Sequence, residues 1–224
     1  MPLILDSNLA LGSNTATQLS LYNGALRNLK ERKLASLTEN REPRRVLDDV
    51  WAGALSYVLE QGLWNFASRT SKFTPNPSYT AAFGYQNQFV KPDDFVRLVG
   101  LYSDPYGNIP LNQYTDEAGA WYSDSSEIYV TYISNDASYG TDFTRWPQTF
   151  TKYVEAYLAF EAGPRITGKD DESLSTIMTK ALRDARSKDA MNEPTKFLPQ
   201  GSWVSARTNG SNGNIRKNRG SLIG

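Results

Sequence analysis

The apolar residues of this chain change their spacing twice along the sequence, and this limits the fold more than any other feature. A helical spacing of three or four residues runs over about 15–30 and 40–62, disappears after Ala67, and returns over about 147–163 and 170–190. Helices that are close in sequence are expected to pack as antiparallel hairpins. The pattern therefore predicts two helical hairpins that together make a four-helix core.

Residues that favour helix ends support these limits. Asn40 is expected to cap the second helix, and Asp170 is expected to cap the fourth. The third helix is expected to end at Gly163-Pro164, because proline cannot continue the hydrogen-bond ladder. Gly24 lies inside the first helix at a cost of about 1 kcal/mol relative to alanine. We therefore expect Gly24 to mark a close packing contact.

Residues 67–145 differ in composition from the rest of the chain. They hold more than half of its aromatic residues and contain repeated turn signals, such as Pro75-Asn76-Pro77 and Tyr106-Gly107-Asn108. Antiparallel pairing through short turns is the expected arrangement. The predicted strands are 84–90, 95–102, 118–122 and 128–133. The predicted fold class is therefore α+β, with an antiparallel β domain inserted into the four-helix core.

The ends of the chain do not follow either pattern. The formal net charge is zero, but residues 194–224 hold five basic residues and no acid, which leaves an acidic body. Such a segment is either a solvated tail or an arm that becomes ordered on a partner. The predicted organisation is an N-terminal arm (1–14), a discontinuous helical-bundle domain (15–66 and 146–190), an inserted β domain (67–145) and an extended basic C-terminal tail (191–224).

The chain has no cysteine and no histidine, which removes many kinds of chemistry. Disulfides, thiolate zinc sites, cysteine nucleophiles and imidazole-based triads are excluded. Carboxylate, lysine or tyrosine catalysis and an all-oxygen metal site stay open. We find no phosphate-binding loop, dinucleotide fingerprint or nucleic-acid motif, and no apolar run of the roughly 18 residues that a membrane span needs. These absences disfavour an enzyme without excluding one, and we expect no cofactor, no metal and no membrane contact.

Paired acids are the strongest candidates for catalysis in this sequence. Two carboxyl groups can cleave glycosides when they lie about 5 Å or 6.5–9.5 Å apart. Neighbouring residues on a strand point to opposite faces, so Asp93 and Asp94 are interpreted as a turn after Pro92 that begins a strand. Asp116 and Glu117 keep the glycosidase alternative open.

Aromatic and basic clusters also admit two interpretations. The aromatic residues of the β stretch are interpreted as core or interface, with a carbohydrate-stacking face as the alternative. Arg41, Arg44 and Arg45 lie at the start of the second helix, where positive charge opposes the helix dipole. We favour salt bridges to a neighbouring subunit over nucleic-acid binding for these three. The aromatic residues in question are Tyr102, Tyr106, Trp121, Tyr122, Tyr129 and Tyr132.

Several short motifs occur in a fixed order between residues 15 and 190. They include Trp64-Asn65-Phe66-Ala67-Ser68-Arg69, Pro92-Asp93-Asp94-Phe95-Val96-Arg97-Leu98, Ile128-Tyr129-Val130-Thr131-Tyr132-Ile133 and Pro147-Gln148-Thr149-Phe150. With the helix pair that precedes them, these motifs resemble the tail tubular protein A family, the head-to-tail adaptors or gatekeepers of short-tailed phages. The framework positions of the resemblance are Trp64, Asn65, Phe66, Pro92, Asp93 and Arg97.

This resemblance implies a structural, non-enzymatic virion protein at the head–tail junction, made in the host cytoplasm. Its subunits are expected to form a ring, a dodecamer, with the portal protein on one face and the tail nozzle protein on the other. The genome, double-stranded DNA, would pass through the lumen without sequence-specific binding, which an acidic body suits because Lys and Arg create DNA affinity. The alternatives are a carbohydrate-binding or peptidoglycan-degrading virion protein and a head-completion protein of a long-tailed phage.

The basic C-terminal tail is the expected portal-binding segment. Phe197 and Trp203 would serve as apolar anchors, and the basic residues that follow would meet an acidic portal surface. Contact with the nozzle side of the ring is the alternative. The basic candidates are Arg207, Arg216, Lys217 and Arg219.

Overall fold

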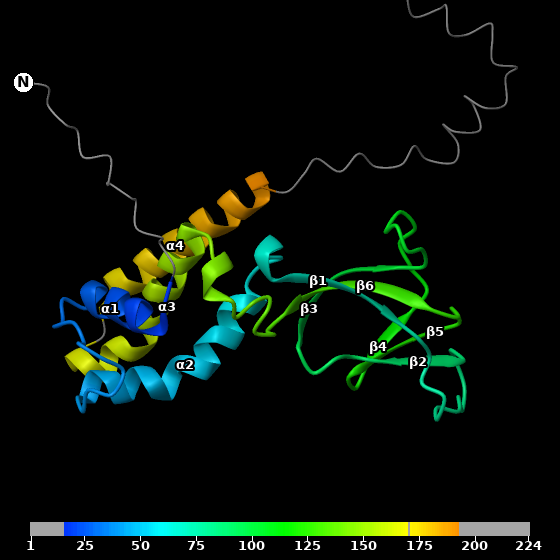
Figure 1. Ribbon diagram of the computed structural model, residues 1–224, viewed down its shortest axis with the longest axis horizontal. Helices are drawn as coiled ribbons and strands as arrows, with labels where there is room; N and C mark the ends of the chain where they lie inside the picture. Colours follow the sequence, from blue (N-terminus) through cyan, green and yellow to red (C-terminus); the bar gives the residue numbers. More distant parts are fainter. Residues whose placement is uncertain (1–15, 170, 193–224) are drawn as a thin grey trace, which may run out of the picture. The chain divides into compact units, whose positions relative to one another are not determined.

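The structure, a computed structural model, describes residues 16–169 and 171–192, which belong to one compact unit. These residues form four α-helices and two small antiparallel sheets, which confirms the predicted α+β class (Figure 1). The helices are α1 (Gln18–Asn28), α2 (Glu42–Glu60), α3 (Gln148–Thr167) and α4 (Glu172–Asn192). The predicted N-terminal arm and all but the first two residues of the predicted tail lie outside the described residues.

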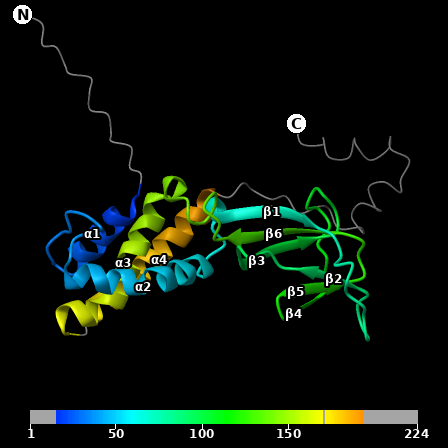
Figure 2. The same cartoon turned by 60° about the horizontal axis from the view of Figure 1, so that its bottom comes forward.

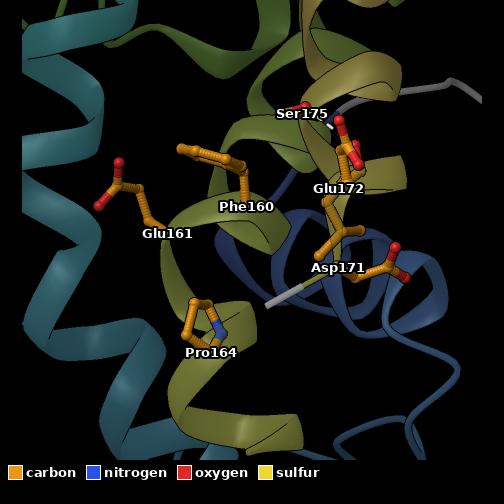
Figure 3. A pocket seen from close by; sticks show the side chains of 7 residues that line it. Phe160, Glu161, Pro164, Asp171, Glu172 and Ser175 are labelled. Carbon is orange, nitrogen blue, oxygen red and sulfur yellow. Dashed lines mark hydrogen bonds between the residues drawn. The ribbon is translucent and has the colours of Figure 1, made fainter. Parts of the chain in front are cut away.

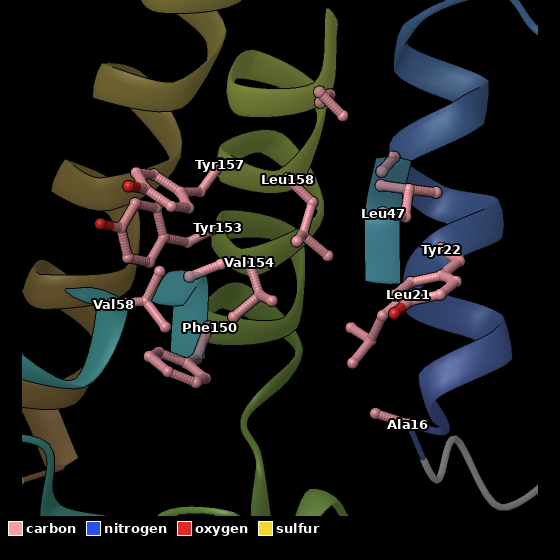
Figure 4. Packing of buried hydrophobic residues seen from close by; sticks show 14 of the residues in the cluster. Ala16, Leu21, Tyr22, Leu47, Val58, Phe150, Tyr153, Val154, Tyr157 and Leu158 are labelled. Atoms are coloured by element: carbon pink, nitrogen blue, oxygen red, sulfur yellow. The ribbon is translucent and has the colours of Figure 1, made fainter. Parts of the chain in front are cut away.

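Helix α3 is the centre of the helical core, because α1, α2 and α4 each pack against it. Its buried side chains therefore point in several directions rather than along one stripe. In Figure 4, Val154 and Leu158 lie on the side of α3 that faces α1, and Tyr153 and Tyr157 lie on the side that faces α4. The sequence of α3 is apolar on most faces because three helices cover it.

Helices α1 and α2 contact each other through Tyr22, which is fully buried. Its hydroxyl donates a hydrogen bond to Asp48 (2.9 Å), and its ring packs edge-on against Trp51 with centroids 5.3 Å apart. Helix α1 begins with a capping box, in which Thr17 accepts from the Ser20 N–H (3.2 Å) and Ser20 accepts from the Thr17 N–H (2.8 Å).

The predicted Asn40 cap of α2 is wrong. Arg41 is the N-cap residue, and it makes no side-chain capping bond. The Asn40 side-chain oxygen instead accepts a hydrogen bond from the Arg45 guanidinium. An asparagine whose oxygen is bound by an arginine side chain is not available to the backbone N–H groups of the first turn.

The predicted end of α3 at Gly163-Pro164 is also wrong, since the helix continues to Thr167. Gly163 is a packing position rather than a stop signal: a Cβ there would lie 3.0 Å from Leu174 of α4. The helix ends at Gly168, which has a left-handed backbone (φ 68°) and whose N–H bonds the Pro164 carbonyl (3.0 Å). The predicted cap Asp170 lies outside the described residues.

The β domain consists of two three-stranded antiparallel sheets (Figure 2). In one sheet the strand order is β1-β6-β3, and in the other it is β2-β5-β4. The strands are β1 (Ser68–Phe73), β2 (Asn87–Val90), β3 (Phe95–Tyr102), β4 (Thr115–Glu117), β5 (Ala120–Ser123) and β6 (Ile128–Ser134). Their inner faces bury a separate core around Phe89, Trp121, Ile128 and Val130.

Three details of the strand prediction need correction. Pairing is mostly between distant segments, such as Ser68 with Ile133, rather than through short turns. Residues 118–119 form the β4–β5 turn instead of beginning a strand, because Ala118 (φ 42°) and Gly119 (φ 83°) have left-handed backbones. Strand β2 begins at Asn87 rather than 84, and β1 and β4 were not predicted.

The β domain and the helical core share a contact region. Ile133 of β6 is buried in the helical core cluster, and Val96 and Val99 of β3 pack against it. No helix in the described part of the chain is long and apolar enough to cross a membrane.

Candidate functional site

Asp94 is the centre of a polar network at the start of β3. It pairs with Arg69 of β1 (2.8 Å), and it accepts hydrogen bonds from Tyr132 (3.2 Å) and Ser134 of β6. Its backbone carbonyl accepts from the Asn135 N–H (3.0 Å). All three strands of this sheet are therefore joined through one carboxylate, and Asp94 is a structural residue.

The environment of Asp94 acts on its charge in two opposing ways. Partial burial alone would raise its pKa, but the hydrogen bonds from Ser134 and Arg69 outweigh this and hold the pKa below its usual value. The carboxyl group is thus stabilised in its ionised form, which suits an ion-pair partner and not a general acid. Asp93, its neighbour, is exposed.

Two further acids of the β domain, Asp116 and Asp124, are held by local contacts, and the remaining glycosidase candidate, Glu117, is exposed. Asp116 pairs with Lys91 (2.6 Å), and Asp124 accepts from the Gln86 N–H (2.9 Å). Glu117 is exposed on the edge strand β4. Within residues 16–169 and 171–192, no group of three or more acidic residues is arranged to hold a metal ion.

The aromatic candidates of the β domain divide into buried and exposed residues. Trp121 and Tyr132 are buried in its core, as the core interpretation predicts. Tyr122 accepts a hydrogen bond from Gln88 (2.8 Å), and Tyr129 donates one to Glu127 (2.6 Å). Tyr106 is 84% exposed. The aromatic candidates do not form one continuous stacking face, because the rings of Trp121 and Tyr132 are buried in the core of the β domain.

Framework residues of the resemblance meet at the C-terminal end of α2. The Trp64 indole is buried and donates to the Val58 carbonyl (3.0 Å), and Arg97 of β3 donates to the Glu60 carbonyl (2.8 Å). From α4, Arg186 donates to the Gln61 carbonyl (2.8 Å). Carbonyl groups at a helix end have no partner within the helix and carry partial negative charge, so two arginines stabilise this end.

Asn65 links the C-terminal end of α2 to α4. Its backbone N–H bonds the Asp189 carboxylate (3.2 Å), and its side-chain amide donates to the Asp189 carbonyl (3.1 Å). Phe66 packs its ring against Phe150 of α3, with centroids 4.7 Å apart. We call the set Trp64, Asn65, Arg97, Arg186 and Asp189 the junction. It connects α2, α4 and the first sheet.

Pro92 and Asp93 contribute to this framework only through backbone geometry. The Pro92 carbonyl accepts from the Phe95 N–H (3.0 Å), which forms the turn before β3. The interpretation of this segment as a turn that begins a strand is therefore confirmed.

Replacing Arg186 by alanine is expected to loosen the end of α4. After Ala185, α4 has no buried residue, so the junction contacts hold its last turns. Loss of the charged hydrogen bonds to the Gln61 carbonyl should cost about 1–2 kcal/mol locally and speed amide hydrogen exchange over residues 186–192. Hydrogen-exchange mass spectrometry tests this, with Arg183→Ala as the matched control. Unchanged exchange over 186–192 would show that the junction does not hold α4.

Glu155 of α3 is a buried acid that the sequence analysis did not identify. Its carboxylate pairs with Arg27 of α1 (2.9 Å), and it lies directly against Gly24. A Cβ on Gly24 would be 2.1 Å from the Glu155 side chain, so the expected close contact at Gly24 is confirmed. Burial raises the pKa of Glu155, and the charges of Arg27 and Lys152 only partly offset this.

Glu155→Gln is expected to change the pH dependence of stability. A raised folded-state pKa means that ionised Glu155 opposes folding, and this cost disappears as the pH falls and the carboxyl is protonated. The advantage of the variant over the wild type should therefore be larger at pH 7 than at pH 5. Urea unfolding at both pH values measures it. An advantage that grows as the pH falls would contradict the assignment.

Arg41, Arg44 and Arg45 each have an acidic partner within the chain. Arg44 pairs with Asp48 one turn along α2, Arg41 lies 3.6 Å from Glu39, and Arg45 lies 4.0 Å from Glu42. Their predicted role in binding a neighbouring subunit stays a prediction.

An acidic groove lies where α3 and α4 meet, near the connection between them. Figure 3 shows Glu161 on the side toward α2, and Asp171 and Glu172 at the start of α4. Apolar side chains of Phe160, Pro164 and Leu174 line the space between the acids. No described basic residue lines this groove, and Glu161 and Glu172 form no ion pair with a described residue, while the charge of Lys30 acts on Asp171 from the neighbouring hollow.

A second groove lies between α1, α3 and α4 and has a basic rim. Ala156, Ile177 and Ala181 supply apolar walls. Lys152 and Lys180 stand on the rim without an ion pair to another described residue, and Glu155 pairs with Arg27 and is also acted on by the charge of Lys152. Arg183 lines the adjoining surface of α4 together with Lys180. We call these two features the acidic groove and the basic groove.

The predicted portal-binding residues Phe197, Trp203, Arg207, Arg216, Lys217 and Arg219 all lie outside the described residues.

Neither a scan against protein-family models nor a search of curated proteins finds a match to this chain. Sequence reasoning also missed Arg186, Asp189 and Glu155. They had no visible signal, since polar residues on amphipathic helices are ordinarily solvated; only Gly24 pointed to the Glu155 contact.

Proposed function

We propose that this chain is a structural subunit of a phage head-to-tail adaptor. Its copies would form a ring, expected as a dodecamer, with the portal protein on one side and the tail nozzle protein on the other. Double-stranded DNA would pass through the lumen without sequence-specific contacts. The protein would act in the virion at the head–tail junction after assembly in the host cytoplasm, and it would have no enzymatic activity.

The observation that carries this proposal is the junction. Trp64, Asn65 and Arg97 were singled out by resemblance alone, from two motifs that are about thirty residues apart in the sequence. All three contact the same end of α2 or the α4 turn beside it. Motifs that matched by chance would not be expected to gather at one joint between a helical core and a β domain. Their convergence supports the adaptor framework, from which function follows by analogy.

Deletion of residues 194–224 tests the portal-binding part of the proposal. The truncated chain should keep the unfolding transition of the full-length protein but lose binding to the portal protein of the same virus, because the aromatic and basic residues of this segment are the proposed contacts. Pull-down with purified portal measures binding, and circular dichroism measures folding. Full binding by a folded, truncated chain would contradict this assignment of the tail.

The double variant Phe197→Ala and Trp203→Ala provides a narrower test. It keeps the length and the charge of the segment while removing both apolar anchors. Weakened portal binding would support anchoring by these rings, and unchanged binding would leave only the basic residues as contacts.

A further inference from the structure

The acidic and basic grooves lie on opposite flanks of α4. Successive residues of an α-helix are rotated by about 100° around its axis. Leu174 is buried against the core. From the direction of Leu174, Ser175 of the acidic groove lies about 100° to one side, and Lys180 of the basic groove lies about 120° to the other. The hairpin of α3 and α4 thus presents two different surfaces, separated by the exposed side of α4 that Ser175 and Lys180 both border.

The acidic flank combines negative charge with exposed apolar surface. Phe160 is 37% exposed, although it belongs to the central helix of the core. Glu161 and Glu172 beside it form no ion pair with another described residue, whereas the positive charge of Lys30 acts on Asp171. Unpaired charges of one sign around an apolar patch are costly to cover with anything except a surface of opposite charge.

The basic flank has the complementary composition. Ile177 is 43% exposed and lies beside Lys180, which has no ion pair with a described residue. Lys152 and Arg183 add positive charge, and Asp184 is the one acid on this flank that no described base neutralises. The net charge of the basic flank is therefore positive, opposite to that of the acidic flank. Both flanks have exposed apolar side chains at their centre.

We propose that the acidic groove of one copy binds the basic groove of the next copy. The contact joins two different surfaces of the same chain, so it is heterologous, and repetition gives a closed ring or an open filament. It rests on the proposed function, because it supplies the subunit contact that an adaptor ring requires. Its occupant is a second copy of this chain, chosen because each flank carries the charge that the other lacks.

Cysteine cross-linking of the full-length protein can detect this contact even when it is weak. The chain has no native cysteine, so Ser175→Cys on the acidic flank and Thr149→Cys on the basic flank provide the reactive positions. Thr149 lies in the first turn of α3 and Ser175 in the first turn of α4, at opposite ends of the helical hairpin, so a short reagent cannot join them within one copy. With a short bis-maleimide reagent, the double variant should give a ladder of dimers, trimers and larger species. Each single variant should give no ladder, because a heterologous contact does not bring two identical positions together.

Charge reversal on the cross-linking background tests complementarity. Lys152→Glu with Lys180→Glu should abolish the ladder, and so should Glu161→Lys with Glu172→Lys. An equimolar mixture of the two reversed proteins should restore it, because one then has two acidic flanks and the other two basic flanks. Lys33→Glu and Glu117→Lys are the matched controls: both positions are exposed, and neither lines a groove described above.

Three results would overturn the contact: no ladder with the native charges, a ladder that survives both reversals, or no restoration in the mixture. Failure of this contact and failure of the adaptor role are distinguishable. A ring that forms on the portal despite both reversals would refute the flank contact and leave the adaptor proposal standing. A reversal-sensitive ladder from a chain that never binds portal would refute the adaptor role alone.

Discussion

Replacing Trp64 by alanine is expected to lower the free energy of unfolding by about 3–5 kcal/mol, the usual range for removing a large buried aromatic side chain. The ring is 1% exposed and packs against Phe150 (centroids 4.8 Å apart), Phe66 and Tyr153. Its indole N–H also satisfies the Val58 carbonyl. The variant would therefore leave a cavity and an unpaired carbonyl at the same place.

Trp64→Phe separates these two contributions. It keeps an aromatic ring but loses the hydrogen bond and part of the volume, so a smaller loss of about 1–2 kcal/mol is expected. Phe83→Ala is the control for a large aromatic deletion without burial, since Phe83 is 92% exposed, and it should change stability by less than about 0.5 kcal/mol. Urea unfolding followed by circular dichroism measures all three. A Trp64→Ala variant as stable as Phe83→Ala would contradict the packing described here.

Replacing Asp94 by asparagine is expected to cost about 2 kcal/mol at pH 7, because charge-assisted hydrogen bonds are worth more than neutral ones. The variant weakens the contacts to Arg69, Tyr132 and Ser134 together. Arg69 is partly exposed, so the cost should be lower than for a fully buried ion pair. Asp93→Asn is the matched control: it is the neighbouring acid, it is exposed, and it should change stability little.

The pH dependence identifies the Asp94 contribution more specifically. The folded-state pKa of Asp94 lies below the usual value for an aspartate, so the unfolded chain takes up a proton at a higher pH than the folded chain does. The stability due to Asp94 is therefore present above about pH 4 and is lost as the pH falls through the lowered pKa. The difference between wild type and Asp94→Asn should shrink below pH 4. A difference that stays constant down to pH 2 would contradict the ion-pair assignment.

The sequence predicts the elements whose apolar residues are regularly spaced. The four helices have clear stripes or an apolar circumference, and β3 and β6 carry alternating or continuous apolar residues, so their existence follows from periodicity. Strands β1 and β4 escape prediction because they are edge strands made mostly of polar residues, such as Ser68-Arg69-Thr70-Ser71. An edge strand with few apolar residues lacks the alternation of apolar and polar residues on which strand prediction depends.

Helix ends and long-range contacts follow less directly from the sequence. Gly163-Pro164 has the composition of a stop signal, but Gly163 is selected by the close approach of Leu174. Asn40 has the composition of a cap, but its oxygen is bound by Arg45. In both cases a side-chain contact overrides the preference for a helix end: a distant one at Gly163 and a nearby one at Asn40. The junction arginines and Glu155 are of the same kind, since their partners are fixed only when the helices pack.

Only part of the candidate site could be predicted from the sequence. The framework positions Trp64, Asn65 and Arg97 were identified from the sequence, and their meeting at the end of α2 is visible only in three dimensions. The acidic and basic grooves could not be predicted, because each is composed of residues from different helices. The basic tail, in contrast, is evident from charge alone.

Electron microscopy of the purified full-length chain mixed with its portal protein tests the central claim most directly. Negative-stain images should show a twelve-fold ring of this chain attached to one face of the portal, and mass photometry should show the matching increase in mass. A chain that remains separate from the portal, or that binds it without forming a ring, would contradict the proposed adaptor function.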